Sequence, residues 1–426
     1  MNPFLILFAI LYFAQHLLDS WLTWLNIAHV RKHQHEVPVY FQDKISLDQY
    51  QKGIAYTREK ARFGMVASWV GVPIFWGLLL SGFYGRLDTT LRALEFGTVG
   101  TGLLYLACIS VIFFLIALPF SLYSTFVIEQ KYGFNRMTLK LWLVDLLKSV
   151  LLSILIGGPI LAAVLWFMEH HLQGLWWLYV CILLSLVQIF IAAIFPVFLL
   201  PLFNKLTPLE EGSLKQQILA LAQRISFRLS GIYTMDGSKR SSHSNAFFAG
   251  LGKLRRIVLF DTLVKSLSEP ELLAVLAHEM GHNVKKHVRT GLMISSAVSL
   301  AGLYVLSVLI SKPWFYDAFQ FTQPSAYAAL LVFMKTSGAF TFFLSPLSSI
   351  LSRKHEYEAD RFAAEVMERR DPMIQGLVKL TRDNLSNLTP HPWYSFVYYS
   401  HPTVMERIRA LERPGARTIP ASLGQS

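Results

Sequence analysis

The sequence predicts a mainly α-helical membrane protein with seven transmembrane helices and a smaller α+β region outside the bilayer. Hydrophobic residues make up 53% of the 426 residues and charged residues only 15%, whereas charged residues make up about 25% of an average soluble domain. Seven apolar stretches reach or approach the roughly 20 residues that a helix needs to cross the hydrocarbon layer. Two other stretches, 204–286 and 352–426, are much richer in charge.

The seven predicted spans form a group of five followed by a group of two. They are Phe4–Ile27, Met65–Tyr84, Val99–Ser124, Leu146–Met168, Leu175–Leu200, Gly291–Ile310 and Ala326–Leu351. We therefore expect an N-terminal membrane domain at residues 1–200. A second domain at residues 201–426 would contain the last two spans, near 291–310 and 326–351, and end in a cytosolic helical region. The first span is not a cleavable signal peptide, because no Lys or Arg precedes Arg31.

The positive charges of the chain predict its orientation. The formal net charge is +12, and cytoplasmic loops of membrane proteins are enriched in Lys and Arg. Several of these residues separate spans one and two, and others separate spans three and four, whereas residues 169–174 contain none. We therefore expect an external N-terminus, with both charged stretches and the C-terminus in the cytosol. Because the basic excess is explained in this way, no nucleic-acid partner is expected.

The first charged stretch predicts a small α+β unit. A helix is expected at Leu214–Arg224, followed by three short β-like runs at Ile232–Met235, Asn245–Leu251 and Arg256–Phe260. A second helix then begins at Ser268, which has capping-box spacing to Glu271.

This second helix contains the pattern His278-Glu279-x-x-His282. Residues four apart lie on one face of a helix, so both imidazoles can converge on one metal ion, with Glu279 placed to act on a metal-bound water. A catalytic zinc ion keeps three protein ligands and leaves its fourth position to water. A third ligand is therefore required, and the alternative is an ordinary helix in which the pattern arose by chance.

Two acidic residues after the seventh span are candidates for the third ligand. Glu356 and Asp360 lie four residues apart on a predicted helix that begins at Ser352, whereas Glu358 should point elsewhere. One carboxylate can bind the metal, and the other can accept a hydrogen bond from a metal-bound histidine. The alternative is a solvated helix start, where acidic residues interact favourably with the helix dipole.

Four motifs together resemble the type I CAAX prenyl proteases, which are integral-membrane zinc endopeptidases that cleave after a prenylated cysteine. The motifs are "HEMGH", "SRKHEYEAD", "SSHSNAFFAG" followed by "RRIVLFDTL", and "YSHPTVMERI". The resemblance implies a zincin-like metallopeptidase domain and seven helices around a water-filled chamber. It also implies one catalytic Zn²⁺ held by His278, His282 and Glu356, with Glu279 as general base and Asp360 as acidic partner. His401 and Arg407 would face the scissile carbonyl.

The segment Asn245-Ala246-Phe247-Phe248 is the candidate strand for substrate binding. An extended peptide can add to an exposed sheet edge through main-chain hydrogen bonds, with pockets selecting alternate side chains. The alternative is a hairpin strand that packs Phe247 or Phe248 into a core, and both roles can coexist.

We therefore expect a zinc endopeptidase that cleaves near the C-terminus of prenylated or other hydrophobic substrates. One alternative is a quality-control protease of membrane proteins without prenyl specificity, and another is a seven-span receptor or transporter with a structural zinc. The expected partners are a peptide or protein substrate and the lipid bilayer. The chain is compact, which suggests a bacterial homologue in the inner membrane; a eukaryotic one would lie in the endoplasmic reticulum.

Overall fold

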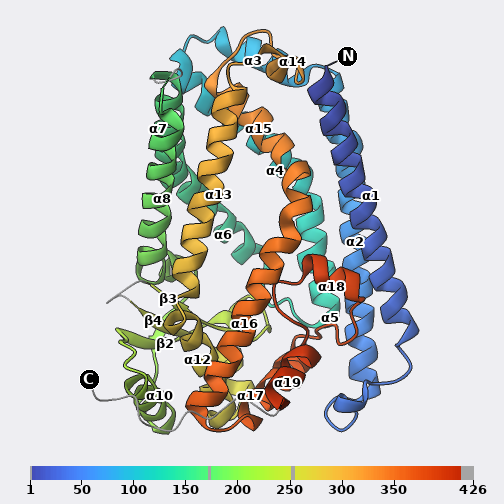
Figure 1. Cartoon of the computed structure of the whole chain (residues 1–426), viewed down its shortest axis with the longest axis vertical. Helices are drawn as coiled ribbons and strands as arrows, with labels where there is room; N and C mark the ends of the chain where they lie inside the picture. Colours follow the sequence, from blue (N-terminus) through green and yellow to red (C-terminus); the bar gives the residue numbers. More distant parts are fainter. Residues whose placement is uncertain (1, 171–173, 251–254, 414–426) are drawn as a thin grey trace.

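Long helices run between two ends of the molecule, and a small β-sheet lies at one of these ends (Figure 1). The computed structural model describes residues 2–170, 174–250 and 255–413. The helices that form the long segments are α1 (Pro3–Lys32), α2 (Leu47–Leu80), α4 (Gly97–Tyr123), α5 (Gln130–Tyr132), α6 (Leu139–Leu152), α7 (Gly158–His170), α8 (Trp176–Ile194), α9 (Leu200–Phe203), α13 (His287–Leu309), α15 (Ala326–Thr341) and α16 (Ser345–Met367). The other helices are α3 (Phe83–Arg92), α10 (Ser213–Arg224), α11 (Asp261–Ser266), α12 (Glu269–Val284), α14 (Pro313–Asp317), α17 (Asp371–Asp383), α18 (Pro392–Tyr398) and α19 (Val404–Glu412).

Seven helical segments of the described residues are long and apolar enough to cross a membrane, which confirms the predicted number of spans. They are Pro3–Lys32, Leu47–Leu80, Gly97–Tyr132, Leu139–His170, Trp176–Phe203, His287–Leu309 and Ala326–Met367. Three of them continue through a π-helical turn, at Ser124–Glu129, Ser153–Gly157 and Phe195–Leu199. The second span starts earlier than its apolar run, because the capping side chain of Ser46 begins the helix at Leu47.

The end of the seventh span differs from the prediction. Helix α16 begins at Ser345 rather than at Ser352, with Pro346 in its first turn, where proline is favoured. Glu356 therefore lies in the middle of a 23-residue helix. Glu356 and Asp360 are only 4% and 2% exposed. The alternative of a solvated helix start for these two acids is therefore wrong.

The sheet has four strands in the order β1-β2-β4-β3. Strands β2 (Gly231–Met235), β3 (Ala246–Ala249) and β4 (Arg256–Phe260) match the predicted runs, except that Leu251 lies outside the described residues. Strand β1 (Leu206–Pro208) was not predicted, since three residues that include a proline carry too little β signal. Strand β4 is parallel to β2 and antiparallel to β3, so β3 forms an edge of the sheet.

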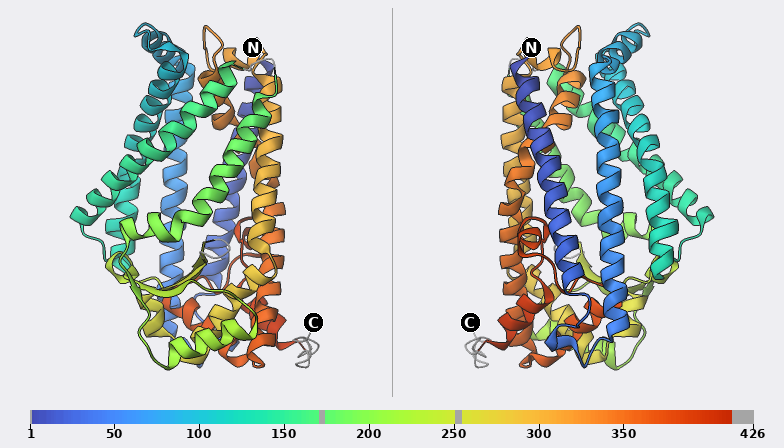
Figure 2. Two further views of the ribbon diagram at one scale, coloured as in Figure 1. Left: turned by 90° about the vertical axis from the view of Figure 1, so that its left-hand side faces the viewer. Right: turned by 90° about the vertical axis from the view of Figure 1, so that its right-hand side faces the viewer.

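Helix α12 packs against strand β3 and against helices α10, α16 and α17 at the sheet end of the molecule (Figures 1 and 2). Every residue from Glu271 to His278 is buried, as expected for a helix enclosed on most sides. Glu271 accepts a hydrogen bond from the backbone N–H of Ser268 and forms an ion pair with Lys379 of α17. The start of the helix is therefore fixed both to its own backbone and to a neighbouring helix.

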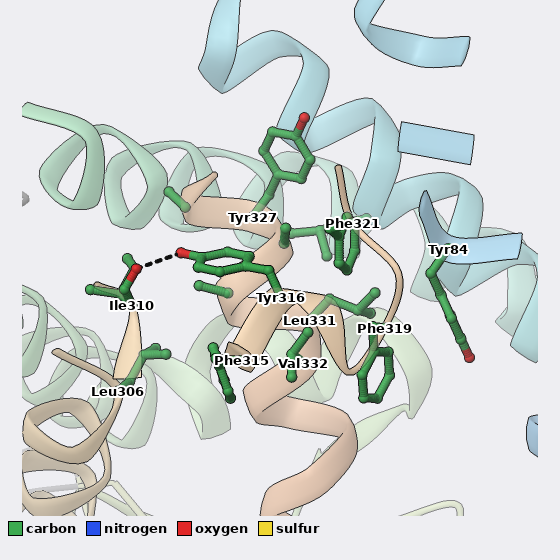
Figure 3. Packing of buried hydrophobic residues seen from close by; sticks show 14 of the residues in the cluster. Tyr84, Leu306, Ile310, Phe315, Tyr316, Phe319, Phe321, Tyr327, Leu331 and Val332 are labelled. Atoms are coloured by element: carbon green, nitrogen blue, oxygen red, sulfur yellow. Dashed lines mark hydrogen bonds between the residues drawn. The ribbon is translucent and has the colours of Figure 1, made fainter. Parts of the chain in front are cut away.

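Aromatic side chains join the long helices at the end opposite the sheet. The cluster there includes Tyr84 of α3, Phe315 and Tyr316 of α14, and Tyr327 of α15, all almost fully buried (Figure 3). The hydroxyl of Tyr316 donates a hydrogen bond to the carbonyl of Ile310 at 2.8 Å. Burial of large aromatic side chains dominates the energetics of such clusters, so this end holds the helices together far from the sheet.

Candidate metal centre

Helices α12 and α16 bring the two histidines and one acid of the predicted ligand set together. The Nε2 atoms of His278 and His282 lie 3.2 Å apart. The carboxylate of Glu356 places Oε1 3.3 Å from Nε2 of His282 and Oε2 3.5 Å from Nε2 of His278. Ligand atoms about 2.0–2.1 Å from a tetrahedral zinc ion are about 3.3 Å from one another. The three side chains therefore form a group that can hold a metal ion.

The charges around these atoms also fit a cation. Oε2 of Glu356 is buried and accepts no hydrogen bond within the described residues, although Nη1 of Arg407 and Nε2 of His278 each lie 3.5 Å from it. A metal ion bound at this oxygen would satisfy it more closely than these contacts do. Burial lowers the pKa of His278, but the neighbouring carboxylates of Asp360 and Glu356 outweigh this effect and raise the pKa to about 9. The site therefore stabilises a positive charge among these side chains.

Asp360 fixes the orientation of His278. Nδ1 of His278 lies 2.8 Å from Oδ1 of Asp360, so an Nδ1–H donated to this carboxylate leaves Nε2 free to bind a metal. The guanidinium of Arg407 from α19 donates to both Asp360 oxygens, at 2.8 and 2.6 Å. This bidentate pair fixes the carboxylate in turn.

Glu279 and His401 lie at a cavity of about 550 Å³ beside the ligand group. The cavity is also lined by Ser244, Asn245, Ala246, Leu263, Val275, Met373, Leu377, Leu380, Asn384, Ser386 and Arg407. Burial raises the pKa of Glu279, as expected for a partly buried carboxyl. His401 is 63% exposed, and its Nε2 lies 3.4 Å from Oε1 of Glu356. Arg407 also lines the cavity, but its guanidinium is bound to the carboxylate of Asp360, whereas the side chain of His401 is largely exposed.

Among the described residues, no strand pairs with the outer edge of β3, and this strand begins next to the cavity. The carbonyl of Asn245 accepts a hydrogen bond from the backbone N–H of Phe260. Backbone groups alternate in direction along a strand, so those of Ala246 and Phe248 point away from β4. Phe247 packs with Phe260, while Phe248 packs with Phe227 in a different cluster. Core packing and an open edge thus coexist in this strand.

Comparison with known proteins agrees with this arrangement. Residues 26–205 match the family model described as "CAAX prenyl protease N-terminal, five membrane helices", and residues 208–414 match that of peptidase family M48. CAAX prenyl protease 1 of Saccharomyces cerevisiae is 35% identical over 94% of this chain and 93% of its own length. The chain belongs to the CAAX prenyl protease 1 family, within peptidase family M48. It is therefore a membrane metallopeptidase.

Further relatives cover this peptidase over nearly its full length. The CAAX prenyl protease 1 homolog of Homo sapiens is 31% identical over 94% of this chain and 95% of its own length. The crystal structure of S. mikatae Ste24p superposes with a TM-score of 0.90 at 34% identity, covering 97% of this chain and 99% of that one. These relatives are eukaryotic, so they lend no support to the expected bacterial origin.

Sequence reasoning missed one residue beside the metal ligands of this peptidase. His287 is buried, with its Nδ1 3.0 Å from Nδ1 of His282 and its Nε2 3.0 Å from Glu358. Glu358 points away from the metal ligands, as predicted. Lys286 separates α12 from α13 and has a left-handed backbone, with φ of 63°. Because this residue breaks the helix, the spacing from His282 to His287 does not follow helical periodicity.

The close approach of α12 and α16 in this peptidase depends on Gly281. A Cβ atom at this position would lie 3.2 Å from Cα of Ala359 and 3.0 Å from the ring of Phe362. We expect Gly281→Leu to move the helices apart, lowering the free energy of unfolding by about 1–3 kcal/mol and weakening metal binding. Thermal unfolding and metal content would measure the two effects. Gly291→Leu is the control, because open space surrounds Gly291, and equal behaviour of the two variants would contradict the prediction.

Proposed function

We propose that the chain is a zinc endopeptidase that hydrolyses peptide bonds near the C-terminus of prenylated CAAX-type substrates. The observation that carries the proposal is the group of His278, His282 and Glu356, with Glu279 beside it at a cavity that adjoins an open strand edge. The family membership supports the substrate class, because the relatives are called CAAX prenyl proteases.

One Zn²⁺ is the metal that suits these ligands best. Two imidazoles and a carboxylate are the ligand set of several catalytic zinc sites. Three protein ligands leave a coordination position open, whereas a structural zinc is enclosed by four. The ligand set therefore favours an enzyme over a receptor or transporter with a structural zinc. When bound, zinc would polarise a carbonyl oxygen and lower the pKa of a bound water to about 7.

The remaining residues of the cavity would carry the proton transfers and stabilise charge. Glu279 would accept the proton of the attacking water and pass it to the leaving amine, a role that suits its raised pKa. His401 reaches the cavity with an exposed side chain, so it would donate to the carbonyl oxygen as negative charge develops. Arg407 would add positive charge there while it holds Asp360, which in turn orients His278.

The substrate backbone would lie along β3. The outward carbonyl of Ala246 and the outward N–H and carbonyl of Phe248 can pair with an extended peptide without regard to its side chains, whereas the N–H of Ala246 donates to Oδ1 of Asn245 at 2.8 Å. Asn245 is exposed at the start of the strand and lines the cavity, so its amide side chain can contact the peptide next to the scissile bond. Phe247 and Phe248 would hold the strand in place through their packing on opposite faces.

The arrangement in the membrane is part of the same proposal. We place the catalytic region and the C-terminus in the cytosol and the N-terminus outside, because Lys and Arg gather in cytoplasmic loops. Residues 1–200 would form the membrane domain and residues 201–426 the metallopeptidase domain. Six of the seven spans bury only 11–17% of their most apolar window. A solid bundle would bury one face of each helix, so the low burial supports a chamber between the helices.

Cleavage of a matched pair of peptides tests the substrate class. The purified peptidase, loaded with zinc, would be given one CAAX peptide with and without its prenyl group. Burial of only about four methylene groups, at about 0.8 kcal/mol each, would raise kcat/KM by about 200-fold for the prenylated peptide. Equal kcat/KM for both peptides and for unrelated membrane proteins would instead support a quality-control protease. Removal of zinc by a chelator should abolish cleavage of either peptide, and added zinc should restore it.

A further inference from the structure

The second metal-binding histidine has a hydrogen-bond partner of its own, on the side away from the metal. His282 faces His278 and Glu356 with Nε2, while its Nδ1 lies 3.0 Å from Nδ1 of His287. On the other side of the His287 ring, Nε2 lies 3.0 Å from Oε2 of Glu358. The three side chains form a continuous line that leads from the ligand group to a carboxylate.

The protons in this line have only one arrangement that is compatible with metal binding. His282 must keep the lone pair of Nε2 for the metal, so its proton is on Nδ1 and is donated to His287. Nδ1 of His287 must then be an acceptor, which places the His287 proton on Nε2. That proton is donated to Glu358, whose carboxylate can only accept. Both imidazoles are neutral in this arrangement, and every nitrogen has a partner.

We propose that His287 and Glu358 are positioning residues that hold His282 in the tautomer and ring orientation required for zinc binding. This inference depends on the proposed function in one respect, which is that the bound metal is zinc. His278 is held directly by the carboxylate of Asp360, whereas His282 is held by a carboxylate through an intervening imidazole. Helix α16 thus supplies one ligand, Glu356, and the carboxylates that orient both histidines.

The surroundings of His287 favour this role over that of an ordinary core histidine. The residue is only 7% exposed, and its ring stacks on that of His355 at a centroid distance of 4.0 Å with an angle of 8°. The stacking fixes the plane of the imidazole, so its Nδ1 is directed at His282. Glu358 is 38% exposed, so its carboxylate stays ionised more readily than one in the core. A metal-bound imidazole that donates to such a partner is a stronger ligand.

Zinc affinity of the His287→Phe variant of the full-length protein tests the proposal. Phenylalanine preserves the ring and its stacking on His355 but can neither accept from His282 nor donate to Glu358. We expect zinc to bind about 10–100-fold more weakly, the usual cost of losing such a partner. Competition with a chromophoric zinc chelator would measure the affinity without reference to peptide cleavage. The His287→Asn variant should recover most of the affinity, because Asn Oδ1 can occupy the position of the accepting Nδ1.

Two further variants separate this role from a general effect on folding. His355→Phe preserves the stacked pair and removes no hydrogen bond to His282, so it should bind zinc as tightly as the wild type. Glu358→Leu removes the carboxylate that accepts from His287, at a position that is 38% exposed. Like His287→Phe, it should weaken zinc binding. Thermal unfolding of the zinc-free variants would show whether each one folds.

Equal zinc affinity of His287→Phe and His355→Phe would overturn the proposal. If His287→Phe does not fold, the proposal depends on Glu358→Leu, and wild-type affinity of that folded variant would overturn it as well. A wild-type protein that binds zinc but cleaves no prenylated peptide would contradict the proposed substrate class. That result would not affect the comparison of zinc affinity between His287→Phe and His355→Phe.

Discussion

Replacement of Glu279 by glutamine should lower kcat for peptide cleavage by about 10²–10⁴-fold, the usual contribution of a general base. Glutamine has nearly the same shape as glutamate but cannot accept the proton of the attacking water. The ligand group of His278, His282 and Glu356 does not include Glu279, so zinc content should stay at the wild-type level. Single-turnover cleavage of a prenylated peptide and metal analysis of the same sample would measure both quantities.

Glu269→Gln provides the matched control for this experiment. Glu269 lies on the same helix, α12, and contacts Ser213 and Gln217 rather than the ligand group. This variant should cleave peptide at the wild-type rate. Cleavage by zinc-loaded Glu279→Gln at a rate close to that of Glu269→Gln would remove Glu279 from the mechanism.

The Glu356→Ala variant should lose both metal and activity. It removes the only ligand that α16 supplies and leaves two histidines from a single helix. Replacing a residue that merely orients a ligand costs about 10–100-fold in metal affinity, so the loss of a ligand should exceed 100-fold. Chelator competition would measure the affinity, and cleavage should fall below detection at zinc concentrations that saturate the wild type.

A neighbouring acid on α16 distinguishes the loss of a ligand from a general loss of charge. Glu365→Ala changes the net charge by the same amount, and Glu365 does not line the cavity. It should bind zinc as the wild type does. If Glu356→Ala instead retained one tightly bound zinc ion and activity, the third ligand would have to be another residue.

Much of the fold could be predicted because its determinants are local. A membrane span depends on the length and composition of one stretch of chain, and all seven spans were found in this way. The same holds for α12, since its capping residue, Ser268, and the helical spacing of His278 and His282 lie close together in sequence. The errors occurred where a local signal was weak, as in β1, or where polar residues continued an apolar helix, as in α2 and α16.

The site could be predicted only in part for the same reason. Helical spacing placed His278 and His282 on one face, and Glu356 and Asp360 on another, but it left open which acid would bind the metal. The structure resolves this, since Asp360 contacts Nδ1 of His278 while Glu356 lies beside both Nε2 atoms.

From sequence alone, the chain is predicted to be a seven-span membrane protein with one helix that presents His278 and His282 to a metal and Glu279 to a metal-bound water. The contact of α16 with α12 at Gly281, the unpaired outer edge of β3 among the described residues and the position of His287 between His282 and Glu358 became apparent only in the folded structure. Spans and helical faces follow from spacing within one stretch of chain. The ligand group, in contrast, depends on packing between helices that are far apart in sequence, and no local pattern encodes which faces will meet.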